Sequence, residues 1–315
     1  MGGAPGRLHV RLAADAASVA GVRRFVADGL DAWGEGRFAD AAELVASELT
    51  TNVALHAGAE FMYVTLERTE AGVRVSVEDD GPLGAEVVQA RTPTAEDATW
   101  IELDATGRGL AIVGMVAHRW GVDETTRGKH VWADLADPDE VAPASPAPQP
   151  ERPPDRPVTH ELPPGWAMVR LAACPVELSL QQDRHLDELV RELQLLSVDQ
   201  DNPESAALAR EIRGLLISPT AARLTGRRAA ERARAEGREV VDIDMAMPRE
   251  FSDLVTQLHV AVIRAEELCR EGRLLTLASP PDVQELRAWM THEIVAQATT
   301  GAAPTPWADW RSGAG

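Results

Sequence analysis

Three polar side chains recur at four-residue intervals in the segment ELTTNVALH, residues 48–56. Glu48, Asn52 and His56 would lie along one face of a helix, because an α-helix has about 3.6 residues per turn. Burying such groups without partners costs about 1–3 kcal/mol each, so a purely apolar core helix would not carry them. A carboxylate can accept a proton and an amide oxygen can ligate Mg²⁺, which indicates a metal and general-base site. The alternative is a solvated helix edge.

A second group follows the strand-like segment VRVSVE. Residues 79–84, with the sequence DDGPLG, place carboxylates at a strand end and then supply glycines. Glycine lets a ligand approach the backbone closely, so this segment indicates ligand binding. The alternative is a plain turn, since Asp, Gly and Pro are ordinary turn residues.

A third group is Gly107-Arg108-Gly109-Leu110, ahead of an apolar segment. Glycines at a helix N-terminus expose backbone N–H groups, and the positive end of the helix dipole favours an anion there. This arrangement would hold a phosphate without a lysine. The lysine-containing GxxxxGK[ST] loop is absent, and Lys129 is the only lysine in the chain. An ordinary glycine-rich helix start is the alternative.

Hydrophobic periodicity predicts the elements that must position these groups. Apolar spacings of three and four predict helices, and alternation with period two predicts strands, one pair of which forms a hairpin. The predicted helices are 17–33, 39–57 and 109–120, and the predicted strands are 8–14, 61–68, 72–80, 121–124 and 129–135, with a loop over 81–106. This order predicts an α+β fold with helices on one face of a mostly antiparallel sheet.

Prolines crowd residues 138–164, where neither a helix nor a central strand can continue. We expect a semi-rigid linker there, between a domain over 1–137 and another over 165–315. The second domain is predicted to be all-α. Its predicted helices are 178–197, 203–217, 219–236, 248–272 and 281–298, with 239–247 as one short strand or an extended connection and a loose C-terminal tail. His185 and His259 fall among apolar residues on these helices, which favours packing over metal ligation.

The chain is acidic, with 31 Lys+Arg against 50 Asp+Glu and a net charge of −19. This charge argues against nucleic acid and against an anionic membrane surface as direct partners. No apolar run is long enough to span a membrane, and the N-terminal segment lacks the apolar core of a secretion signal. Cys174 and Cys269 have no metal-type spacing, so a cytoplasmic protein with buried thiols is expected.

The order and spacing of the three groups resemble the GHKL ATP-binding fold, which gyrase, a heat-shock chaperone, histidine kinases and a mismatch-repair ATPase share. The closing strands resemble those of one branch, the anti-sigma-factor serine/threonine kinases. The residues that carry the resemblance are Glu48, Asn52 and His56 for the N-box, Asp79 and Gly81 for the first glycine box, residues 107–110 for the second, and Trp120-Gly121 followed by GKHVWADL. It covers about residues 8–136 and implies a Bergerat-type α/β sandwich.

The resemblance implies that this domain binds ATP and Mg²⁺. Asp79 would accept the adenine amino group, and Gly81 would make room for the ring, with Gly84 nearby. Asn52 would ligate Mg²⁺. Glu48 would act as the general base or orient the attacking hydroxyl group.

The phosphates would meet the second glycine box. The resemblance implies that Gly107, Gly109 and Leu110 contribute backbone contacts there and that Arg108 adds positive charge. His56 stands where the family often has a histidine closing the N-box, and a core or helix-capping histidine is the alternative.

Two positions depart from the family pattern. Leu83 takes the place of the second glycine in the first glycine box, with Gly84 one residue later. His130 stands where the closing strand often carries threonine. Neither change removes a charged catalytic group.

Two functions follow from this reading. The first is a serine/threonine protein kinase that phosphorylates a small anti-anti-sigma partner of the STAS type, with a sigma factor as a further partner. The second is an ATP-binding sensor or adaptor without transferase activity. In both, residues 165–315 form a regulatory or dimerising domain, so a homodimer is one arrangement that the sequence permits.

Overall fold

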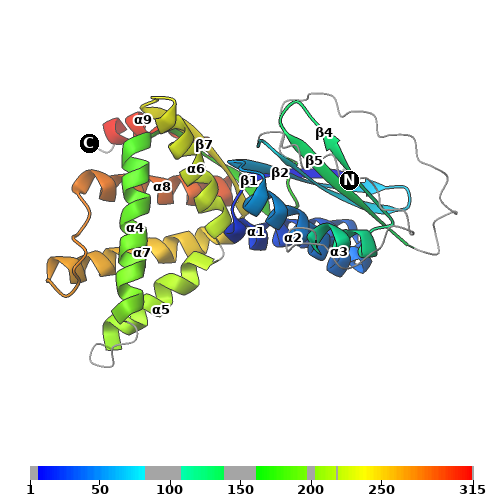
Figure 1. Ribbon diagram of the computed structural model, residues 1–315. Coiled ribbons are helices and arrows are strands. Elements are labelled where there is room, and N and C mark those ends of the chain that lie inside the picture. The colour runs from blue at the N-terminus through cyan, green and yellow to red at the C-terminus, as the bar shows by residue number, and fades with distance from the viewer. Residues whose placement is uncertain (1–5, 82–107, 138–160, 197–202, 218, 314–315) are drawn as a thin grey trace. The chain divides into compact units, whose positions relative to one another are not determined.

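The computed structural model describes residues 6–81, 108–137, 161–196, 203–217 and 219–313 (Figure 1). These residues belong to two units, Met1–Pro164 and Gly165–Gly315. Residues 138–160, which make up most of the predicted proline-rich linker, lie outside the described ranges.

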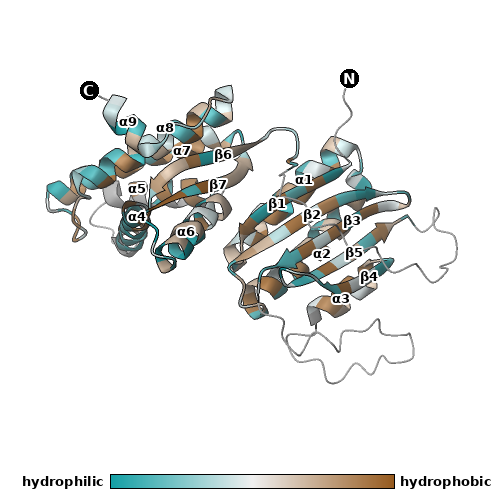
Figure 2. Cartoon of the chain, turned by 90° about the horizontal axis from the view of Figure 1, so that it is seen from above, coloured by the Kyte–Doolittle hydropathy of each residue, from teal (hydrophilic) through white to brown (hydrophobic). Residues whose placement is uncertain are grey.

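A five-stranded antiparallel sheet forms the centre of the first unit. Its strands are β1 (Arg7–Ala13), β2 (Phe61–Thr69), β3 (Gly72–Asp79), β4 (Arg119–Glu124) and β5 (Lys129–Ala136), in the order β1-β2-β3-β5-β4. Hydrophobic and hydrophilic residues alternate along these strands (Figure 2). Because successive side chains point to opposite faces, this alternation gives the sheet one apolar face.

Helices cover the apolar face. They are α1 (Val19–Trp33), α2 (Ala39–His56) and the shorter α3 (Arg108–Val116), with the 3₁₀ turns Ala16–Ser18 and Gly36–Phe38 preceding α1 and α2. Gly29 of α1 shows how tightly the layers pack, since a β-carbon there would lie 2.6 Å from Cδ1 of Leu8 and 2.8 Å from Cδ2 of Leu66. The predicted α+β class, with helices on one face of a mostly antiparallel sheet, is confirmed.

The third helix is shorter than predicted. It ends at Val116, whereas the glycine-rich and apolar pattern predicted a helix to residue 120. Strand β4 begins at Arg119, and that guanidinium donates to Asp134 of β5 at 2.8 Å. Pairing with β5 therefore takes Trp120 into the sheet, which helical periodicity alone could not show.

The second unit contains helices and one two-stranded sheet. Strands β6 (Trp166–Pro175) and β7 (Val240–Pro248) pair antiparallel. The helices are α4 (Val176–Leu196), α5 (Pro203–Ile217), α6 (Thr220–Ala235), α7 (Phe251–Arg270), α8 (Pro281–Thr300) and α9 (Trp307–Gly313). The second unit is mainly helical, as predicted. It is not all-α, because it contains the two-stranded β6–β7 sheet. Strand β6 was missed because its partner lies far along the chain.

The C-terminal tail, predicted to be loose, contains α9. Trp307 of this helix is buried, and its ring meets that of Trp289 edge-on at a centroid distance of 5.6 Å. The indole N–H of Trp289 also donates to the carbonyl of Thr305 at 3.0 Å. Burial of an aromatic ring therefore orders a segment whose Gly and Pro content indicates a coil.

Buried polar side chains also hold the second unit together. His185 is buried on α4, with Nε2 3.6 Å from Oε1 of Glu266, which agrees with its predicted packing role. Cys174 and Cys269 are free and buried, and burial raises their thiol pKa values to about 12 and about 11. Across the described ranges, no helix is both long and apolar enough to cross a membrane.

Replacing Trp307 with alanine tests the ordered tail. Trp307→Ala should lower the free energy of unfolding by about 3–5 kcal/mol, because it removes a buried aromatic side chain. Trp310→Ala is the matched control, since Trp310 is only half-buried, and it should cost about 1 kcal/mol. Urea unfolding followed by circular dichroism measures both, and equal losses would contradict the described packing of α9.

Candidate functional site

Helices α2 and α3 bring the first and third groups of candidate residues together. Glu48 and Asn52 are half-buried on α2, one turn apart, and Gly109 lies at the start of α3. A β-carbon at position 109 would lie 2.9 Å from Oε2 of Glu48 and 3.2 and 3.3 Å from the side-chain amide atoms of Asn52. Only glycine leaves the two polar side chains in place while the backbone of α3 comes this close.

Asp79 is the most deeply buried of the candidate polar residues. It ends β3, and only 2% of its surface is exposed. Its Oδ1 accepts a hydrogen bond from the backbone N–H of Gly81 at 3.1 Å. Its Oδ2 is buried and has no hydrogen-bond partner among the described residues. A buried carboxylate oxygen of this kind is suited to a ligand that brings a donor.

Burial also sets the charge state of Asp79. Desolvation raises its pKa, while the Gly81 hydrogen bond and the nearby charge of Lys129 partly oppose that rise. The strand register accounts for the contribution of Lys129, because Glu78 pairs with His130 and residues 79 and 129 directly follow and precede that last pair. Lys129, which could be taken for a solvated hairpin residue, is in fact half-buried beside the site.

Two glycines enclose the turn after Asp79. A β-carbon on Gly81 would lie 2.2 Å from the carbonyl oxygen of Ala57, the residue that follows α2. A β-carbon on Gly128, in the β4–β5 hairpin, would lie 2.4 Å from the carbonyl oxygen of Asp79. Both positions therefore exclude side chains. The resemblance included Gly128 only as part of the closing strands and gave it no role in the site.

Helix α2 connects the two parts of the site. Asn52 contacts the start of α3, and Ala57, five residues later, contacts Gly81. At about 1.5 Å per residue, these points are about 7–8 Å apart along the helix. The C-terminal half of α2 thus has Asp79, with its carboxylate oxygen that is unpartnered among the described residues, near one end. The Glu48 carboxylate and the Asn52 amide lie near the other end.

The remaining candidate residues have different placements. His56 is exposed at the last residue of α2, and Leu110 is half-buried in the first turn of α3. Arg108 opens α3, but its side chain is not described. Gly84 and Gly107 lie outside the described residues. The structure thus brings together Glu48, Asn52 and Gly109, and separately Asp79 and Gly81.

His130, the departure in the closing strand, does not face the site. It pairs with Glu78 and Asp123 on its two neighbouring strands. Residues in register share a face, and Asp79 is one position from Glu78, so His130 lies on the face opposite Asp79. Burial lowers its pKa, although the neighbouring Glu78 and Asp123 carboxylates oppose that shift. The change from threonine therefore leaves the Asp79 side of the sheet unaltered.

The donor set around Gly109 fits a hard cation that keeps other ligands. Glu48 and Asn52 offer oxygen atoms, and Mg²⁺ in proteins is commonly bound through one or two such side chains with water and phosphate oxygens completing the shell. A cluster of three or more His, Cys, Asp or Glu residues able to hold a metal by themselves is not found within the described ranges. These residues therefore fit a cation that arrives with an anionic ligand.

Comparison with protein families gives one result that covers this site. Residues 12–135 match the family model described as "Histidine kinase-like ATPase domain". A search of curated proteins finds no match to the chain. The matched range includes Glu48, Asn52, Asp79 and Gly109, and it supports a GHKL-like ATPase domain in the first unit.

The raised pKa of Asp79 predicts an unusual effect on stability. A carboxyl group with a higher pKa in the folded state binds protons more readily there, so stability is lost as pH rises from the unfolded-state pKa through the folded-state pKa. Asp79→Asn should therefore stabilise the nucleotide-free protein at pH 7 and remove this part of the pH dependence. Urea unfolding between pH 3 and pH 8 provides the measurement.

Asp80 provides the matched control. Its Oδ1 accepts hydrogen bonds from the backbone N–H groups of Glu60 and Phe61, both at 2.9 Å. Asp80→Asn should destabilise the protein by about 1–2 kcal/mol, because it weakens charge-assisted hydrogen bonds. If both substitutions destabilise the protein, the negative charge of Asp79 does not lower the free energy of unfolding, and the prediction is wrong.

Proposed function

We propose that the first unit binds Mg·ATP and transfers the γ-phosphoryl group to a serine or threonine of a small anti-anti-sigma partner. The observation that carries this proposal is the convergence of Glu48 and Asn52 on Gly109 at the start of α3. Phosphoryl transfer depends mostly on positioning and charge stabilisation, so a site with few titratable groups can perform it.

The Asp79 end supports adenine binding. The exocyclic amino group of adenine is a hydrogen-bond donor, and the buried Oδ2 of Asp79 is an acceptor without a partner among the described residues. Gly81 and Gly128 keep side chains away from this carboxylate. In the proposal, Asp79 orients the base, and a base that presents a carbonyl group in place of the amino group binds less well.

The Gly109 end supports phosphate and metal binding. Backbone N–H groups at the start of α3 have no partner within the helix and lie at the positive end of its dipole, so they would donate hydrogen bonds to phosphate oxygens. Asn52 would hold Mg²⁺ through its amide oxygen. The cation would neutralise phosphate charge as it builds up during transfer.

Glu48 is the proposed catalytic residue. In the transfer, the hydroxyl oxygen of the partner forms a bond to the γ-phosphorus, and the bond from that phosphorus to the β–γ bridging oxygen breaks. ADP leaves, and the hydroxyl proton passes to the Glu48 carboxylate, which also orients the attacking hydroxyl group. The amide of Asn52, one turn away, cannot serve as this base.

The partners and location form part of the proposal. A small anti-anti-sigma protein would supply the hydroxyl group, and a sigma factor with a basic or apolar surface would suit the acidic chain. We place this activity in the cytoplasm, where ATP is available. The second unit would regulate the first or dimerise.

A second candidate function is an ATP-binding sensor or adaptor without transferase activity. The separate unit Gly165–Gly315 favours it, because a second unit with its own core in the same chain offers a place where a signal can act. Incubation with labelled ATP and small candidate partners separates the two functions. Transfer of label supports the kinase, and nucleotide binding without transfer to any partner supports the adaptor.

Glu48→Gln should bind ATP with nearly normal affinity but transfer phosphate at least about 100-fold more slowly, because the amide cannot accept the proton. Transfer of labelled phosphate measures the rate, and calorimetry measures ATP binding. Glu43→Gln is the matched control on the same helix, and it should keep both properties. Unchanged transfer by Glu48→Gln would rule out Glu48 as the base.

Asn52→Ala should weaken ATP binding in the presence of Mg²⁺ by about 10- to 100-fold, which is the effect expected for loss of a contact to a charged group. In the presence of a chelator, this variant and the wild type should bind ATP equally weakly. Calorimetry at both conditions makes the comparison. If the two proteins bind Mg·ATP with equal affinity, Asn52 is not the metal ligand.

A further inference from the structure

The second unit contains a cavity of about 160 Å³ between its helices and the β6–β7 sheet. Helices α4, α5, α6, α7 and α8 all contribute to its wall, together with both strands. Most of the lining is hydrocarbon, and examples are Leu186, Leu216, Ile243, Met245, Val262 and Ile294. The cavity therefore lies at the meeting point of the main elements of this unit.

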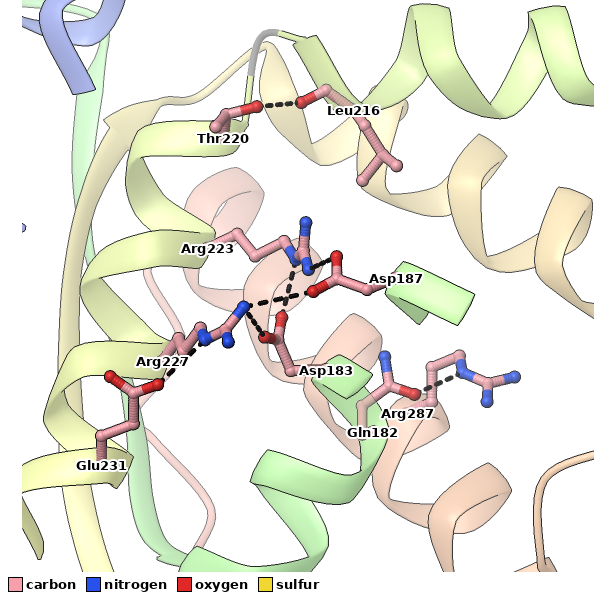
Figure 3. Close-up of polar contacts among 9 residues, drawn as sticks. All are labelled: Gln182, Asp183, Asp187, Leu216, Thr220, Arg223, Arg227, Glu231 and Arg287. Atoms are coloured by element: carbon pink, nitrogen blue, oxygen red, sulfur yellow. Dashed lines mark hydrogen bonds and ion pairs between the residues drawn. The ribbon is translucent and has the colours of Figure 1, made fainter. Parts of the chain in front are cut away.

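Asp183, Arg223 and Arg227 contribute charged side chains to the cavity wall. Figure 3 shows the ion pairs and hydrogen bonds among these residues and their neighbours. Arg223 donates from Nε to Oδ1 of Asp183 at 2.7 Å, and it also bonds Asp187. Arg227 lies 3.2 Å from Oδ2 of Asp183 and 3.1 Å from Oδ2 of Asp187. Desolvation raises the pKa of Asp183, but these two guanidinium groups oppose the shift. Each of these four charged side chains is thus in contact with a side chain of opposite charge.

Arg287 lines the cavity from α8 and is also paired. Its Nε donates to Oε1 of Gln182 at 3.0 Å, and its Nη1 donates to Oε1 of Glu266 at 2.8 Å. Its Nη2 donates to the hydroxyl of Ser279 at 2.9 Å. Glu266 is 1% exposed, and its pKa falls to about 2 because hydrogen bonds and the Arg287 charge outweigh its desolvation. The charge of Arg287 is therefore balanced within the protein.

Two residues of the wall, Asp183 and His259, have a buried side-chain atom without a hydrogen-bond partner among the described residues. Oδ2 of Asp183 is in ion-pair contact with Arg227 at 3.2 Å, so Nδ1 of His259 is the atom that a neutral ligand would complement. Desolvation lowers the pKa of this imidazole, and the positive charge of Arg287 lowers it further, while Glu266 opposes both. A neutral imidazole presents one donor and one acceptor nitrogen, so a hydroxyl group can complement Nδ1 in either tautomer.

We propose that this cavity binds a neutral, monocyclic and mainly hydrocarbon small molecule whose hydroxyl group hydrogen-bonds Nδ1 of His259. The pocket is partly open to solvent, and its volume matches the scale of a single ring, because an apolar cavity of about 150 Å³ accommodates benzene. Neutrality follows from the charged side chains of the wall, which are paired with each other or with neighbours. A charged ligand would lose its hydration without gaining an unpaired counterion.

The hydroxyl requirement gives the proposal a direct test with two probes. p-Cresol carries a ring, a methyl group and a hydroxyl, and toluene is the same molecule without the hydroxyl. The full-length protein should bind both in a saturable manner, with p-cresol about 5- to 10-fold tighter, as expected for one hydrogen bond to an otherwise unpartnered buried group. Calorimetry and ligand-observed saturation-transfer NMR measure the affinities.

Two substitutions locate the binding site. His259→Phe keeps a ring but removes the nitrogen, so it should abolish the preference for p-cresol over toluene. Ala222→Leu adds bulk to the cavity wall and should weaken both probes at least 10-fold. His292→Phe is the matched control, because His292 packs against Trp310 outside the cavity wall, and it should leave both affinities unchanged.

Three results would overturn the proposal. The first is the lack of saturable binding of either probe at millimolar concentration. The second is equal affinity of the wild type for both probes, a comparison that needs no variant and so holds even if a substitution prevents folding. The third is binding that neither His259→Phe nor Ala222→Leu alters in folded protein. None of these measurements involves nucleotide, so they are independent of the proposed phosphoryl transfer.

Discussion

The close packing of α3 against α2 is the constraint on which the candidate nucleotide site depends. Gly109 brings backbone N–H groups next to Glu48 and Asn52, and a β-carbon there would meet both side chains. Gly81 and Gly128 impose the same condition on the turn around Asp79. These three glycines thus set how closely the backbone approaches the polar side chains of the site. The sheet and α1 pack against α2 and hold it in the position that this approach requires.

Both units bury polar groups, but they satisfy them differently. The first unit leaves Oδ2 of Asp79 without a partner among its described residues, at a cost to stability that a bound base would offset. The second unit pairs the charges around its cavity and leaves Nδ1 of His259 without a hydrogen-bond partner in the described part of the chain. In each unit, one of these atoms lies where the proposed ligand would bring a complementary group.

Much of the fold was predictable from sequence because hydrophobic periodicity reports which face of an element is buried. It predicted α1, α2 and the β2–β3 hairpin closely, and the spacing of Glu48 and Asn52 predicted that they share a face. It could not predict β6, whose partner β7 is far away in sequence, or α9, which depends on burial of Trp307. It also gave no site role to Gly128 and Lys129, since the β4–β5 hairpin brings them to Asp79 only in the folded sheet.

The central claim is that the first unit binds ATP through Asp79 at one end and through Asn52 with Mg²⁺ at the other. Calorimetric titration of the full-length wild-type protein with ATP and with GTP, each in the presence of Mg²⁺, tests it most directly. We predict saturable binding of one ATP per chain and much weaker binding of GTP, whose base presents a carbonyl group where adenine presents its amino group. No ATP binding at millimolar concentration, or equal affinity for the two nucleotides, would contradict this account.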